Sequence, residues 1–162
     1  MADYVTSTGD PALRSLVFDR LPRPDFADIQ VLPLPAGAST DPRWWAEQIF
    51  AIGHAPKPVV ALMALRQALV GLIGVSRGDQ HAFDVVEVVG EEALMDTDDR
   101  HLRFCCGVGV DAGRSLLRVT TGVELKGWRG RVYFAPVSVL HGPVVRAMTS
   151  AAIARTTGRQ EG

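Results

Sequence analysis

The most regular apolar pattern of the chain lies near its C-terminus. Over residues 136–157, apolar side chains recur at spacings of three and four, which predicts a long helix with one broad apolar stripe. The members of the stripe are Val137, Leu140, His141, Val144, Val145, Met148, Ala151 and Ala152. Proline is tolerated in a first helical turn, so we expect this helix to begin at Pro136 and to follow a strand over residues 128–134.

A period of two dominates the middle of the chain. Apolar and polar residues alternate there, and turns that contain glycine or aspartate separate the alternating stretches. The pattern predicts strands over residues 82–89, 92–96, 101–110 and 115–126. Because the turns are short, successive strands should pair antiparallel, as a meander.

One strand and two helices precede this meander. The stretch FADIQVLPLP begins at Phe26 and predicts a strand that its prolines end. A helix capped by Asp41 or Thr40 is predicted to run to about residue 52, and a second helix to occupy residues 58–72.

These elements predict the α+β class. The apolar face of an antiparallel sheet needs a cover, and the C-terminal helix has a stripe wide enough to supply it. We therefore expect a helix-grip fold, a curved antiparallel sheet wrapped around a long C-terminal helix, with two short helices after the first strand. The expected division is an irregular N-terminal segment over residues 1–24, one domain over 25–157 and a flexible C-terminus over 158–162.

Composition and charge narrow the classes of protein. The 162 residues are 47% apolar and carry a formal net charge of −1, without a run of Lys and Arg, so no nucleic-acid partner is expected. No secretory signal is expected, and residues 58–75 are too polar at their centre for a membrane span, which needs about 20 mainly apolar residues. The adjacent Cys105 and Cys106 predict reduced thiols in a cytoplasmic protein. No metal-ligand spacing, phosphate loop or catalytic triad is present, so neither metal nor cofactor is expected.

Alternation assigns faces to the strands and singles out Glu87. This carboxylate shares the expected apolar face of its strand with Phe83, Val85 and Val89, where it would be costly unless it is paired or protonated. Two interpretations stand. Glu87 either reaches solvent at the strand end, or it is a pocket carboxylate able to act as an acid or base.

Other candidates for chemistry lie on the helices. Arg66 either extends into solvent or turns inward to hold Glu87 or an anionic group. His141 lies in the apolar stripe and is either a packed core residue or the best acid–base candidate, because the unperturbed pKa of histidine is about 6.5. His141 and Glu87 are thus the catalytic candidates. The substrate-binding candidates are Arg66, Tyr133, Trp45, Phe104 and Met148.

The stretch GRVYFAPVSVLHGPVVRAMTSAA resembles a known family. It is similar to the strand-to-helix signature of a bacterial domain-of-unknown-function family in the helix-grip (START-like, SRPBCC, polyketide cyclase-like) superfamily. Members show Gly-Arg-x-Tyr-Phe, a Pro and then a His, which correspond here to Gly130, Arg131, Tyr133, Phe134, Pro136 or Pro143, and His141. The stretch DRHLRF and the residues Trp44, Trp45 and Arg66 also fit. The resemblance covers residues 25–155 and departs at Ser138, where relatives tend to carry Pro-Phe-His.

The resemblance implies a small-molecule cavity. Members of the superfamily bind hydrophobic small molecules, and some are polyketide cyclases, so one hypothesis is a cyclase- or dehydratase-like tailoring enzyme of biosynthesis. A second hypothesis is a carrier that binds a hydrophobic molecule without chemistry, and a third is a structural domain with a packed interior. A homodimer is a further possibility, because an exposed Trp44 or Trp45 would indicate a contact surface.

Overall fold

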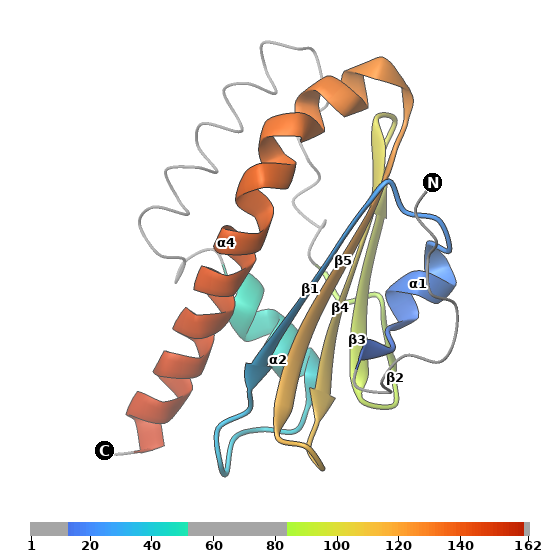
Figure 1. Ribbon diagram of the computed structural model, residues 1–162. Coiled ribbons are helices and arrows are strands. Elements are labelled where there is room, and N and C mark those ends of the chain that lie inside the picture. Colours follow the sequence, from blue (N-terminus) through green and yellow to red (C-terminus); the bar gives the residue numbers. More distant parts are fainter. Residues whose placement is uncertain (1–12, 52–83, 161–162) are drawn as a thin grey trace.

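The structure is built on a five-stranded antiparallel sheet of strand order β1-β5-β4-β3-β2. The computed structural model describes residues 13–51 and 84–160. The elements in chain order are α1 (Leu16–Arg20), β1 (Phe26–Pro33), α2 (Pro42–Phe50), β2 (Glu87–Val89), β3 (Glu92–Asp98), β4 (Leu102–Asp111), β5 (Leu116–Leu125) and α4 (Gly127–Gln160). The predicted α+β class is confirmed, and the sheet with its long C-terminal helix is consistent with a helix grip (Figure 1). The second predicted helix, over residues 58–72, lies outside the described residues.

Helices cover both faces of the sheet. On one face, α2 and α4 pack against the strands, and on the other α1 does (Figure 1). The larger core lies under α2 and α4, where Trp45, Val108 and Met148 are almost completely buried. Val108 of β4 and Leu117 and Val119 of β5 lie on this face, where the alternation of apolar and polar residues directs them. A shift of the register by one residue would move each of these side chains to the other face.

The helix α1 lies in the N-terminal segment that was expected to be irregular. Ser15 caps it by accepting a hydrogen bond from the amide of Val17, and Val17 and Leu21 pack against Leu94 of β3. A buried carboxylate fixes this helix start to the sheet. Glu92, only 6% exposed, accepts hydrogen bonds from the Ser15 hydroxyl at 2.5 Å and the Leu16 amide at 2.9 Å. The α1 side of the sheet is therefore a closed, structural face.

The start of the C-terminal helix differs from the prediction. Residues 128–134 are not a strand, because α4 already begins at Gly127, and Pro136 and Pro143 both lie inside it. The buried residues Gly130 and Phe134 continue the stripe of Val137 and His141 backward at helical spacing, and this longer stripe decides the conformation. Each internal proline lacks the N–H that would bond to the residue four before it, and the rest of this 34-residue helix retains its ladder.

A close backbone approach fixes the first turn of α4. The amide of Lys126 donates a hydrogen bond to the carbonyl of His101 at 2.8 Å. A Cβ atom at Gly130 would lie 2.2 Å from this same carbonyl oxygen, so only glycine allows the helix to pass here. From this end of the sheet α4 runs diagonally across β1 and β5 to α2 (Figure 1). The domain has the organisation of a soluble protein, with one segment, Phe134–Gly158, long and apolar enough to cross a membrane.

Candidate functional site

A row of polar side chains lies on the edge strand β1, between the sheet and α4. In the pairing of β1 with β5, Phe26 lies opposite Val123, Asp28 opposite Thr121 and Gln30 opposite Val119. The alternate residues Phe26, Asp28 and Gln30 thus share the face on which α4 packs. A Cβ atom at Gly142 of α4 would lie 3.5 Å from Gln30 Nε2 and 3.9 Å from Asp28 Oδ2, so the helix passes directly over this row.

The two polar residues of the row bind each other. Gln30 Nε2 donates to both carboxylate oxygens of Asp28, at 3.1 and 3.0 Å. Both side chains are only half-buried, so the row is reached from solvent where the edge strand meets the helix. Asp28 is thereby held in place on a face that is otherwise apolar, while its carboxylate keeps lone pairs for a further donor.

His141 is the helix residue that faces this row. Its ring makes an edge contact with Phe26, with 5.4 Å between centroids. Burial lowers the pKa of His141 below its usual value, and the nearby charge of Asp28 opposes this effect only in part. The imidazole is therefore neutral at pH 7. Its Nε2 atom is buried and has no hydrogen-bond partner within the described parts of the chain, which leaves an unsatisfied polar atom between sheet and helix.

Aromatic rings form the apolar surroundings of this row. Phe26 packs edge-on against Phe134 of α4 at 5.1 Å, and both belong to a cluster with Val123 and Val137. Phe104 of β4, a predicted substrate-binding residue, packs against this cluster and also against the larger core. The structure thus brings Phe104 and His141 to the same side of the sheet, around a polar centre supplied by β1.

The two cysteines do not add a reactive group. Both are free thiols, as predicted, on opposite faces of β4. Desolvation raises the pKa of each, to about 12, so neither is a thiolate at neutral pH. On the α4 face, Thr121 Oγ1 lies 3.9 Å from Cys106 Sγ and is completely buried with it.

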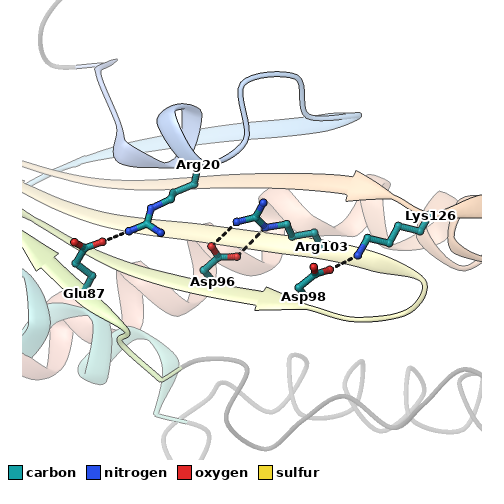
Figure 2. Close-up of polar contacts among 6 residues, drawn as sticks. All are labelled: Arg20, Glu87, Asp96, Asp98, Arg103 and Lys126. Atoms are coloured by element: carbon teal, nitrogen blue, oxygen red, sulfur yellow. Dashed lines mark hydrogen bonds and ion pairs between the residues drawn. The ribbon is translucent and has the colours of Figure 1, made fainter.

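Glu87 lies on the opposite face from His141 and its side chain is 41% exposed, so the interpretation in which it reaches solvent agrees with the structure and the pocket carboxylate does not. The carboxylate of Glu87 is paired with Arg20 of α1, and Glu87 lies opposite Leu94, which packs under α1 (Figure 2). Strict alternation failed because β2 begins only at Glu87, so Val85 packs into the α4-side core before regular strand geometry starts. Figure 2 shows two further ion pairs along this side of the sheet, Arg103 with Asp96 and Lys126 with Asp98.

Of the remaining predicted site residues, two are core residues, and the side chains of the other two lie outside the part of the chain that the structure describes. Trp45 is completely buried, and its indole N–H donates to the Ser39 carbonyl at 2.7 Å. Met148 is a core residue on the inner face of α4 and is 4% exposed. Arg66 lies outside the described residues, as does the side chain of Tyr133.

A separate pocket lies at the far end of α4. Its volume is about 320 Å³. It is lined by Gly37, Ala38, Ser39, Trp44, Gln48, Arg155 and Thr156. Arg155 donates from Nη2 to the Gln48 carbonyl at 2.7 Å and so ties α4 to the last turn of α2. His141 is not among the lining residues, so this hollow is distinct from the polar row.

Sequence reasoning missed Asp28 and Gln30. The available signal was their spacing of two along the strand, which places Asp28 and Gln30 on the same face as the apolar residues Phe26 and Leu32. The sequence did not reveal that β1 pairs with β5, and this pairing brings the face that carries Asp28 and Gln30 under α4. Together with His141 the row offers a fixed carboxylate, an amide and a neutral imidazole, a set that can bind a hydroxyl or carbonyl group or move a proton.

Comparison with known proteins identifies a family. Residues 20–148 match the family described as Protein of unknown function (DUF2867). A search of the curated proteins and a search of the solved structures gave no match. The match agrees with the expected domain-of-unknown-function family and gives no support to membership of the START-like superfamily.

Proposed function

We propose that this chain, which belongs to the family Protein of unknown function (DUF2867), binds a small apolar molecule between its sheet and α4. The observation that carries this proposal is the buried Nε2 of His141, which has no partner in the described residues although it lies beside Asp28. A buried polar atom without a partner costs about 1–3 kcal/mol, and a ligand that bonds to it recovers this free energy. The cytoplasm is the proposed location, supported by the two free thiols.

The residues around His141 specify the chemical class of the ligand. The rings of Phe26 and Phe134 favour a flat apolar body. Neutral His141 can accept from a hydroxyl or donate to a carbonyl, and the carboxylate of Asp28 repels an anion. The ligand is therefore a neutral aromatic or polycyclic molecule with a hydroxyl or keto group, a description that includes polyketide-like metabolites.

Three related probes test this specificity. Calorimetric titration with 2-naphthol, naphthalene and 2-naphthoate compares a hydroxyl, no polar group and an anion on one apolar body. We expect 2-naphthol to bind tightest and 2-naphthoate weakest. In His141→Leu the preference for 2-naphthol over naphthalene should fall by about fivefold to tenfold, the contribution of one hydrogen bond. The matched control is Val88→Ala on β2, which should bind all three as the wild type does. Equal affinities for the three probes in the wild type and in His141→Leu would contradict the proposal.

Catalysis by the same residues is the second candidate function. The lowered pKa of His141 keeps its imidazole unprotonated at neutral pH, as a general base must be, and Asp28 stabilises the imidazolium that forms on proton uptake. A cyclase- or dehydratase-like enzyme needs such a group beside the carbon acid of its substrate. If a poly-β-keto substrate is turned over, His141→Ala should reduce kcat by at least about 100-fold. Unchanged turnover in His141→Ala rules out this role.

A further inference from the structure

The outer face of α4 carries an apolar stripe opposite to the one that packs on the sheet. Trp128 is 68% exposed, Val132 55% and Val139 75%. Positions 128, 132, 135 or 136, 139 and 143 follow one another at spacings of three and four, so they share one helix face. Ala135, Pro136 and Pro143 are the other members, and all are exposed. The stripe is about 22 Å long, at a rise of about 1.5 Å per residue.

Arginines border this stripe on both sides. Arg129 and Arg131 lie about 100° and 60° away from Trp128 in opposite directions around the helix, by its rotation of about 100° per residue. Both side chains are exposed, as is Arg146, one turn beyond Pro143. The guanidinium of Arg129 lies 5.5 Å from the centre of the Trp128 ring. No acidic residue occurs anywhere in the sequence of α4.

We propose that the outer face of α4 over residues 128–146 is a docking surface for an anionic lipid bilayer. An apolar stripe flanked by arginines, with a tryptophan at one end, has the chemistry of a helix that lies in a membrane interface. The charge complementarity is specific, because three exposed arginines and no carboxylate on this helix meet a negative surface. The inference does not depend on a ligand at His141, whose side chain faces the other way.

Two other occupants fit the surface less well. A second copy of the chain would bring two cationic helix faces together, and the two prolines in the stripe interrupt the regular ridges that helix pairs use. A transmembrane arrangement is also unfavourable, although Phe134–Gly158 has the length and composition for it. In the fold, Val145, Met148 and Ala152 fix the inner face of this segment to the sheet. Only 22% of the most apolar part of this segment is buried, which is consistent with a helix that contacts the protein on one face and lipid on the other.

Binding to vesicles tests the proposal directly. The full-length protein is sedimented with vesicles of phosphatidylcholine and with vesicles of equimolar phosphatidylcholine and phosphatidylglycerol. We expect binding to the anionic vesicles, weakened by added salt, and a shift of Trp128 emission to shorter wavelength that is absent from Trp128→Phe. The double variant Arg129→Gln/Arg131→Gln should lose about 25-fold in partitioning, at about fivefold for each arginine.

Matched variants separate this face from the rest of the molecule. Trp128→Ser/Val132→Ser should lose at least about tenfold in partitioning. The control Arg43→Gln/Val88→Ser removes one exposed arginine and one exposed valine elsewhere and should bind as the wild type does. His141→Leu should also bind normally, so failure of the ligand proposal and failure of this one are distinguishable.

Three outcomes overturn the proposal. The first is no binding to either kind of vesicle by the folded protein. The second is equal binding by the α4 variants and the control. The third is a dimer in analytical ultracentrifugation that Trp128→Ser/Val132→Ser abolishes, because the stripe is then an interface between two copies.

Discussion

A single methyl group at Gly130 should disturb the junction between the sheet and α4. In Gly130→Ala the new Cβ would lie 2.2 Å from the carbonyl oxygen of His101, and separations under 3.0 Å are essentially never seen for real Cβ atoms. The carbonyl belongs to the backbone and cannot rotate away as a side chain would. It also accepts the hydrogen bond from the Lys126 amide that precedes α4. The helix start must therefore move away from the sheet.

The expected loss of stability follows from three contributions. Overpacking typically costs about 1–3 kcal/mol, and weakening of the Lys126 hydrogen bond adds about 1 kcal/mol. The higher helix propensity of alanine opposes both by about 1 kcal/mol. The net loss is thus about 1–3 kcal/mol, which corresponds to a fall in Tm of about 2–4 °C per kcal/mol for a chain of this size.

Chemical denaturation followed by circular dichroism measures this loss. The matched control is Gly158→Ala in the same helix, where an added Cβ meets no atom within 4 Å. At this position only the higher helix propensity of alanine acts, so the free energy of unfolding of Gly158→Ala should be unchanged or rise by up to about 1 kcal/mol. The reasoning is refuted if Gly130→Ala is as stable as the wild type, or if both variants change equally.

Three further outcomes are expected. Glu92→Ala should lose about 3–5 kcal/mol in chemical denaturation, because it removes the acceptor of the buried Ser15 hydroxyl and the carboxylate that pairs with Arg118 at 3.3 Å. A loss below about 1 kcal/mol would contradict the role of Glu92 as an anchor between α1 and the sheet. Cys105 and Cys106, with pKa values raised to about 12, should react with a thiol reagent at pH 8 only after unfolding. The lowered pKa of His141 means that the unfolded chain takes up its proton first as the pH falls. The free energy of unfolding should therefore fall below about pH 6.5, and His141→Phe should remove that part of the fall; identical pH profiles rule this out.

The sequence predicted the parts of the fold that a buried face determines. Alternation on β4 and β5 gave correct faces because Val108 and Leu117 are completely buried on one side of a paired strand. Alternation failed for residues 128–134, where exposed Trp128 and Val132 mark a helix surface. In such a stretch a period of two and a period of 3.6 both fit a few residues, and only the packing of Gly130 and Phe134 on the sheet decides.

The site was predicted only in part. His141 was identified because a titratable residue in an apolar stripe is visible in the sequence. Its neighbours Asp28 and Gln30 required knowledge that β1 is an edge strand beside β5. Glu87 was placed on the wrong face because the chain before β2 does not keep strand geometry, and its pairing with Arg20 joins residues far apart in the sequence.

Imidazole nitrogen spectra of the labelled protein test the central claim most directly. Titration with 2-naphthol should shift the Nε2 resonance of His141, since the hydroxyl binds at that atom. The ring of His101, buried where α4 begins, is an internal control and should not shift. In Gln30→Ala the carboxylate of Asp28 loses its hydrogen-bond donor, so the shift should persist at lower affinity. A His141 resonance that stays constant while 2-naphthol binds elsewhere would contradict a ligand site between the sheet and α4.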